Sequence, residues 1–179
     1  MKGKERALKV KMIIMDVDGT LTDGNLLVMP DGEELKSYNV KDGLGILLAH
    51  LAGLKTGIIT GKISKSLERR AEKLRIFEIY QGVLDKKRVL EEIVEKNSLN
   101  LEEVAYIGDD LGDIEVIKSV GLAGAVADAH PVVKEHSHFI CKNSGGKGAV
   151  REFIEFILDS QGKWELVETK IKDLSNRKI

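Results

Sequence analysis

Short apolar runs rich in isoleucine, valine and leucine alternate with helical patterns along this chain, and this alternation restricts its fold more than any other feature. We expect strands at 10–15, 55–60, 77–80, 104–107, 122–127 and 139–141. Helical periodicity follows five of them, in segments that begin near Asp42, Ser64, Asp85, Asp113 and Gly148. Strands that alternate with helices form βαβ units, so the sequence predicts an α/β fold with a doubly wound, Rossmann-like parallel sheet.

A turn signal lies between the first strand and the first helix. Asp31-Gly32 separates two segments of mixed apolar character, 25–30 and 33–38, which is typical of a hairpin. We therefore predict a β-hairpin insertion over 25–38. Asp42 is placed to cap the helix that follows, and Gly53 to end it.

The chain of 179 residues fits one globular domain, which we place at 1–161. Residues 162–179 are polar and show no sustained periodicity, so we interpret them as a C-terminal tail, either disordered or docked on a neighbour. The longest apolar runs fall far short of the ~20 residues that cross a bilayer. The single cysteine, Cys141, excludes an internal disulfide framework and indicates a reducing compartment. We expect a soluble, cytoplasmic protein without a membrane partner.

The charges of the chain are almost balanced, with 28 Lys and Arg against 29 Asp and Glu. No positive surplus is present to neutralise phosphate groups, which argues against nucleic acid as the main partner.

Polar residues follow three of the predicted strands. The first strand ends in Asp16-Val17-Asp18-Gly19-Thr20, another ends in Thr60-Gly61-Lys62, and the strand at 104–107 ends in Gly108-Asp109-Asp110, with Asp113 one turn later. In an open α/β sheet, ligands bind at the carboxyl ends of the strands, so we expect these clusters to share one crevice. Several carboxylates in one crevice repel one another unless a cation lies among them, and a set of oxygen ligands favours Mg²⁺.

Each cluster also has an ordinary explanation when it is taken alone. Asp-x-Asp-Gly-Thr could be a turn, Thr60 a helix cap, Lys86 a solvated lysine, and Asp109-Asp110 a cap. Their combination, in this order and each at the end of a strand, favours chemistry over these separate explanations.

With these motifs in place, the chain resembles the haloacid dehalogenase superfamily of aspartate-nucleophile phosphatases over residues 10 to 160. The resemblance implies that Asp16 is the nucleophile and forms an aspartyl-phosphate, and that Asp18 is the general acid and base. It assigns the phosphoryl oxygens to Thr60 and Lys86. It also implies that Asp16, the Asp18 carbonyl and Asp109 hold Mg²⁺, with support from two further carboxylates, Asp110 and Asp113.

The spacing of the motifs leaves no room for the cap domain that larger members of this superfamily insert. A capless site is open to water unless another element closes it. The hairpin carries consecutive apolar residues, Leu26 to Met29, on both faces, which is typical of an interface. We expect an oligomer in which the hairpin of one subunit covers the site of its neighbour; the alternative is that the hairpin folds back on its own domain.

Further stretches resemble one capless family, the 3-deoxy-D-manno-octulosonate 8-phosphate phosphatases. They are Asp16–Gly24, Asn39–Gly45, Ala125–Ala129 and Gly145–Glu152. The resemblance implies a homotetramer, an acidic sugar-phosphate substrate and a role in making the lipopolysaccharide inner core. It implies that the substrate contacts are Asp18, Asn39, Val40, Lys41, Asp42, Gly43, Lys62, Arg70 and Lys86.

The chain departs from this family at Lys41 and Lys62, where arginine is common. Lysine keeps the charge but lacks the fork of donors that suits a carboxylate or phosphate, so affinity for the sugar could differ.

Two alternatives stay open. One is a phosphatase of another nonulosonate-type sugar-acid phosphate, because few side chains touch the sugar. The other is a phospho-accepting switch of the receiver type, which also uses an aspartate, Mg²⁺, a threonine and a lysine. Asp18, two residues after the expected nucleophile, favours turnover over a lasting phosphoryl group.

Overall fold

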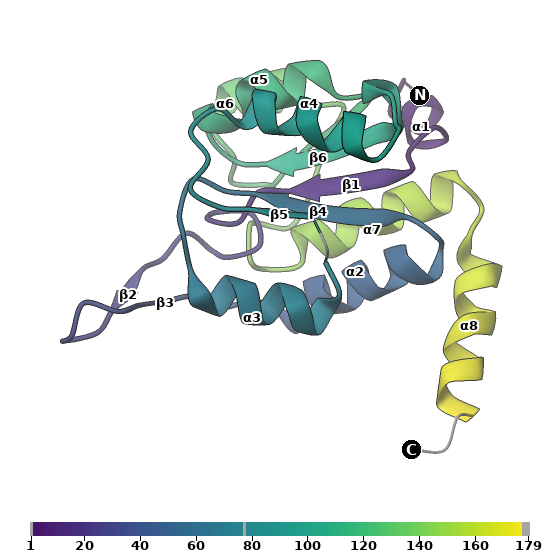
Figure 1. Ribbon diagram of the computed structural model, residues 1–179. Coiled ribbons are helices and arrows are strands. Elements are labelled where there is room, and N and C mark those ends of the chain that lie inside the picture. Colours follow the sequence, from purple (N-terminus) through teal and green to yellow (C-terminus); the bar gives the residue numbers. More distant parts are fainter. Residues whose placement is uncertain (1, 77, 177–179) are drawn as a thin grey trace.

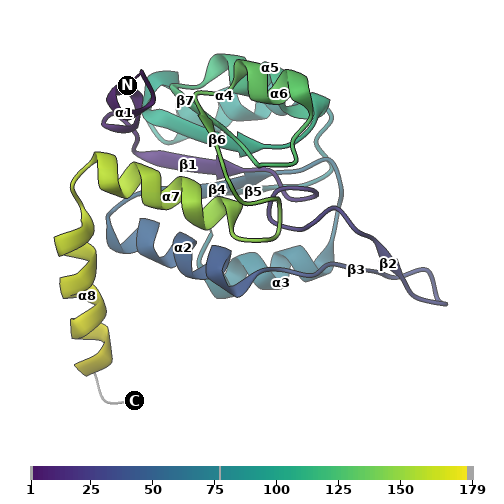
Figure 2. The ribbon, with the colours of Figure 1, turned by 180° about the vertical axis from the view of Figure 1, so that it is seen from behind.

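The structure is a computed structural model that describes residues 2–76 and 78–176 (Figures 1 and 2). Its centre is a six-stranded sheet in the order β5-β4-β1-β6-β7-β8, in which every neighbouring pair is parallel. The strands of this sheet are β1 (Met12–Met15), β4 (Lys55–Ile59), β5 (Glu78–Tyr80), β6 (Val104–Gly108), β7 (Leu122–Ala125) and β8 (Phe139–Ile140). The predicted doubly wound parallel sheet is confirmed, and residue 77, where one predicted strand starts, lies outside the described residues.

Helices cover both faces of the sheet, as Figures 1 and 2 show from opposite sides. One face carries α4 (Lys86–Lys96), α5 (Ile114–Ser119) and α6 (Pro131–His136), and the other carries α2 (Val40–Leu51), α3 (Lys65–Leu74) and α7 (Ala149–Ser160). Two short 3-10 turns, η1 (Leu101–Glu103) and η2 (Leu111–Asp113), flank β6. The four inner strands, β4, β1, β6 and β7, are almost wholly apolar and buried, as expected for a parallel sheet that is covered on both sides.

A β-hairpin follows β1, as predicted, and projects away from the body of the protein (Figure 1). Its strands, β2 (Leu27–Val28) and β3 (Glu34–Leu35), are shorter than the predicted segments and pair in antiparallel fashion. The apolar side chains of the hairpin are exposed, with 61% of Leu27 and 60% of Val28 accessible. The hairpin therefore does not fold its apolar residues onto the described part of its own domain.

The cap of α2 was predicted wrongly. Asn39, and not Asp42, is the N-cap, and its side chain accepts a hydrogen bond from the amide of Lys41. Asp42 lies inside the first turn, where its buried carboxylate accepts hydrogen bonds from the amides of Gly148 (3.2 Å) and Arg151 (2.9 Å) at the start of α7. The Asp42 carboxylate thus links α2 to α7 instead of capping α2.

Residues 162–179 were interpreted as a polar tail that is disordered or docked on a neighbour, but residues 164–176 form α8 (Trp164–Asn176), and residues 177–179 lie outside the described residues. Trp164, Val167, Ile171 and Leu174 recur at spacings of three and four, which is a helical pattern among many charged residues. Val167 is fully buried, and the Lys170 ammonium donates to the carbonyl of Leu51 at the end of α2 (2.7 Å). This helix therefore docks on the chain's own domain.

Two short helices were not predicted. They are α1 (Lys2–Ala7), next to α7 and β7, and α6, which begins at a proline in its first turn. Both have six residues, too few to show periodicity. Among the described residues, no helix has both the length and the apolar character needed to cross a bilayer.

Candidate active site

The three polar clusters lie at one edge of the sheet because the strands that carry them are neighbours. Asp16 follows β1, Thr60 follows β4 and Asp109 follows β6, and β1 pairs with both of the other strands. The chain also changes direction across the sheet at β1, which is where open α/β sheets form their binding crevice.

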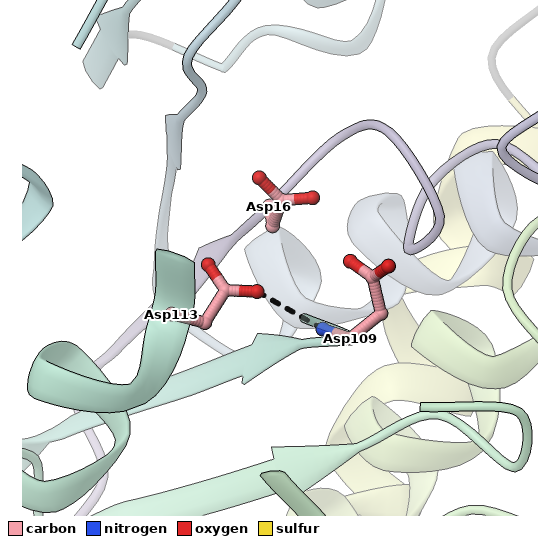
Figure 3. Close-up of side chains that lie close together, drawn as sticks. All are labelled: Asp16, Asp109 and Asp113. Atoms are coloured by element: carbon pink, nitrogen blue, oxygen red, sulfur yellow. Dashed lines mark hydrogen bonds between the residues drawn. The ribbon is translucent and has the colours of Figure 1, made fainter. Parts of the chain in front are cut away.

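Three carboxylates converge at this edge, as Figure 3 shows. Asp16, Asp109 and Asp113 each offer one oxygen, and these oxygens lie within 4.8 Å of one another. The Asp113 carboxylate also accepts a hydrogen bond from the backbone amide of Asp109 (3.0 Å), drawn as the dashed line in Figure 3. Such a group of oxygens has the composition of a site for a hard divalent cation.

Lys86 lies among these carboxylates. It is the first residue of α4, behind the N-cap Asp85, and its ammonium donates to Asp16 Oδ1 at 2.5 Å and to Asp113 Oδ1 at 2.8 Å. Its side chain is only 11% exposed. Burial lowers the pKa of Lys86, but the two carboxylates outweigh burial, so that the net effect is a raised pKa and a lysine that keeps its charge.

The pKa values of two carboxyl groups are raised by their surroundings. Burial, followed by repulsion from Asp113, raises the pKa of Asp16 to about 8, although the nearby Lys86 lowers it. The same two causes raise the pKa of Asp109 to about 6. A divalent cation between these groups would offset the repulsion and keep both of them ionised.

Asp113 differs from its two neighbours because its oxygens are already engaged. Oδ1 accepts hydrogen bonds from Lys86 and from the hydroxyl of the fully buried Tyr106 (2.5 Å), and Oδ2 accepts from the amides of Asp109 and Asp110 (3.3 Å). Tyr106 was not among the predicted site residues, because in the sequence it looks like an ordinary residue of a buried strand.

Asp18 is less buried than Asp16, with 28% of its side chain exposed. Its carboxylate pairs with the ammonium of Lys36, which follows β3 at the base of the hairpin. Lys36 was not among the predicted site residues either, because nothing in the local sequence distinguishes it from a solvated lysine. Nearby, Thr20 donates a hydrogen bond to Asp109 Oδ1 (3.1 Å) and ties the loop after β1 to the loop after β6.

The two remaining polar positions at this edge have different environments. Thr60 is buried, and its backbone bonds to Tyr80 and Val83 on the neighbouring segment. Asp110 is exposed and accepts a hydrogen bond from the amide of Leu111, so it caps η2.

The residues expected to contact the sugar are more scattered. Val40 and Lys41 are exposed at the start of α2, and Lys62 pairs with Glu34 of the hairpin (3.3 Å). Arg70 of α3 lies 6.0 Å from the ring centre of Tyr38 and against Gly43. In the part of the chain that the structure describes, Lys41, Lys62 and Arg70 form no hydrogen bond with the cluster around Asp16. Asp42 is buried and directed toward α7, as described above.

A glycine-rich loop packs against the loop that carries Asp16 and Asp18. The amide of Gly146 donates to the carbonyl of Thr20 (2.9 Å), and Asn39 Nδ2 donates to the carbonyl of Gly146 (3.1 Å). A side chain at position 145 would overlap the backbone of Gly19, so only glycine permits this approach. This approach places Gly145 and Gly146 beside the loop of Asp16 and Asp18, although they lie far from it in the sequence.

Comparison with known proteins identifies the family to which this chain is similar. Residues 57–154 match the family described as haloacid dehalogenase-like hydrolase. The chain is 44% identical over 161 residues to the 3-deoxy-D-manno-octulosonate 8-phosphate phosphatase KdsC of Yersinia pestis, covering 90% of this chain and 86% of that protein.

Solved structures agree with this result. The crystal structure of the Yersinia pestis phosphatase matches with a TM-score of 0.90 at 43% identity, covering 92% of this chain and 89% of that one. The Moraxella catarrhalis 3-deoxy-D-manno-octulosonate 8-phosphate phosphatase, solved with magnesium, phosphate and KDO, matches with a TM-score of 0.91 at 36% identity, covering 94% of this chain and 97% of that one.

Proposed function

This chain belongs to the haloacid dehalogenase-like hydrolases, in the family of the 3-deoxy-D-manno-octulosonate 8-phosphate phosphatases, and on that premise we propose that it hydrolyses this sugar phosphate to the free sugar acid and phosphate. It is a phosphomonoester hydrolase that uses Mg²⁺. The observation that carries the proposal is the cluster of Asp16, Lys86, Asp109 and Asp113 in this chain, which is 44% identical to a phosphatase of this sugar phosphate.

The donor set fits the metal. Asp16 and Asp109 keep unshared oxygen lone pairs, whereas both oxygens of Asp113 already accept two hydrogen bonds. We assign Asp16, the Asp18 carbonyl and Asp109 as ligands, and Asp110 and Asp113 as support. When bound, Mg²⁺ supplies the positive charge that lets a carboxylate and a phosphate approach each other.

The reaction runs in two displacements. The Asp16 carboxylate attacks phosphorus, the ester P–O bond breaks, and Asp18 gives a proton to the leaving sugar oxygen. Asp18, now a carboxylate, then takes a proton from water, which attacks the aspartyl-phosphate, releases phosphate and restores Asp16. Lys86, 2.5 Å from Asp16, and Thr60 hold the phosphoryl oxygens during both steps.

The sugar acid would contact the start of α2 and the side chain of Arg70 on α3. Asn39, Val40 and Gly43 belong to this part of α2, and exposed Lys41 and Lys62 supply positive charge for the sugar carboxylate. Asp42 would act through the position of α2, because its carboxylate is bound to α7.

The exposed apolar hairpin supports the proposal of a homotetramer in which each hairpin covers the site of a neighbour. A cytoplasmic place in the synthesis of the lipopolysaccharide inner core follows from the proposed substrate. We also propose residues 1–161 as the catalytic domain and 162–179 as an appended segment.

The test is phosphate release with Mg²⁺ from a panel of sugar-acid, hexose and nucleotide phosphates, with Asp16→Asn as the inactive control. Preference for 3-deoxy-D-manno-octulosonate 8-phosphate, lost with a chelator and restored by Mg²⁺, supports the proposal. Preference for another nonulosonate phosphate keeps the mechanism and rejects the substrate. A lasting aspartyl-phosphate without turnover would indicate a receiver-type switch.

A further inference from the structure

The side chain of Lys36 is buried, although it lies on a hairpin whose apolar side chains are exposed. Its side chain is only 3% exposed, although its neighbour Leu35 is 38% exposed and residues 25–35 are all exposed. Removing an ammonium from water is costly unless a counter-charge compensates it. The Asp18 carboxylate is that counter-charge.

The dependence is mutual. Among residues 2–76 and 78–176, Lys36 is the only group that hydrogen-bonds the Asp18 carboxylate. Asp16, by contrast, is held by Lys86. Asp16 and Asp18 therefore each pair with a lysine: Asp16 with Lys86 of α4, which also binds Asp113, and Asp18 with Lys36 of the hairpin.

The hairpin backbone explains how Lys36 reaches this place. In an extended segment alternate side chains point to the same face, so Glu34 and Lys36 lie on one face and Leu35 on the other. Glu34 pairs with Lys62 in the loop after β4, and Lys36 pairs with Asp18 in the loop after β1. Both contacts join the base of the hairpin to the loops of its own active site.

From this geometry we propose that Lys36 is a positioning residue: its ammonium fixes the Asp18 carboxylate in the orientation for proton transfer, and the hairpin is thereby part of the catalytic apparatus of its own subunit. The proposal rests on the proposed function, because it takes Asp18 as the acid and base. Without Lys36, the Asp18 side chain would rotate freely at the edge of the site, and a misplaced acid and base is costly in rate.

The test is a double-mutant cycle with Lys36→Met and Asp18→Asn in the full-length protein with Mg²⁺. Lys36→Met should lower kcat/KM for the preferred sugar phosphate by about 10–100-fold, because it removes part of the ~10²–10⁴-fold that acid–base help supplies. In the Asp18→Asn background, Lys36→Met should lower kcat/KM by less than about twofold, because the carboxylate through which Lys36 acts is gone. Lys87→Met, an exposed lysine one residue after Lys86, is the matched control and should leave kcat/KM unchanged.

Two further readouts separate positioning from a structural or binding role. p-Nitrophenyl phosphate has a leaving group that departs without a proton, so Lys36→Met should affect its kcat/KM less than about fivefold. The inhibition constant of inorganic phosphate should change by less than about twofold.

The proposal would be overturned if Lys36→Met lowered kcat/KM by the same factor with and without Asp18→Asn. It would also be overturned if Lys36→Met lowered kcat/KM by the same factor for the sugar phosphate and for p-nitrophenyl phosphate. A phosphate inhibition constant raised about tenfold or more would also overturn it, because Lys36 would then bind the phosphoryl group. The melting temperature of each variant is measured first, and Lys36→Ala repeats the cycle if the methionine variant does not fold. If the wild-type protein releases phosphate and the Asp16→Asn variant does not, the proposed function stands, even where the result for Lys36 contradicts its positioning role.

Discussion

The hydroxyl of Tyr106 should contribute measurably to both stability and activity, although Tyr106 is neither a proposed metal ligand nor a proposed substrate contact. Tyr106 is fully buried on β6, and its hydroxyl donates to Asp113 Oδ1 at 2.5 Å. Burial, reinforced by the Asp113 charge, raises the pKa of Tyr106 well above its ordinary value, so the group stays a neutral donor. Tyr106→Phe removes this donor and leaves the ring in place.

The magnitude follows from the type of bond. A hydrogen bond to a charged acceptor is worth about 1.5–3 kcal/mol, and Asp113 keeps its other three donors. For a chain of this size 1 kcal/mol corresponds to about 2–4 °C, so the melting temperature should fall by about 3–12 °C. Since Asp113 orients Lys86 and the loop of Asp109, kcat/KM should fall by about 10-fold or more.

Thermal unfolding of Tyr106→Phe is compared with that of Tyr38→Phe, which makes the same chemical change. The Tyr38 hydroxyl is buried and has no hydrogen-bond partner in the described part of the chain. Its removal should leave the melting temperature unchanged or raise it, because no bond is lost. If Tyr106→Phe is as stable as Tyr38→Phe, the reasoning about Asp113 is refuted.

Three other predictions concern stability. Asp42→Ala should lower the free energy of unfolding by about 2–4 kcal/mol in denaturant titrations, because two amides of α7 lose their acceptor. Burial, followed by the charge of Arg75, lowers the pKa of His50 below its usual 6.5, so its contribution is complete above that pH and is lost as the pH falls; His50→Gln should flatten this dependence between about pH 7 and 5. Val167→Ala should cost about 1–3 kcal/mol, whereas Leu166→Ala, 43% exposed, should cost less than about 0.5.

Each of these has a clear contrary result. An Asp42→Ala protein as stable as wild type would mean that the link between α2 and α7 is dispensable. Parallel pH curves for wild type and His50→Gln would remove His50 as the titrating group. Equal losses at positions 166 and 167 would contradict the docking of α8 through Val167.

The sequence by itself determined the fold class and the edge of the sheet at which the site lies. Strand and helix periodicities are local patterns of burial, and they are strong for the parallel strands because both faces are covered. The positions of Asp16 and Asp109 follow from these patterns, since residues that end neighbouring parallel strands meet at one edge. The periodicity of α8 was also present, but it lay among charged residues and was missed.

The tertiary structure alone decided which partner each polar side chain takes. Asp42 has the local features of a helix cap, yet it bonds to amides more than a hundred positions later in the chain. Lys36 and Tyr106 resemble ordinary surface and core residues until the fold brings them to Asp18 and Asp113. Periodicity records only whether a residue is buried, whereas a hydrogen bond depends on the position of a second group, and for distant groups that position exists only once the chain has folded.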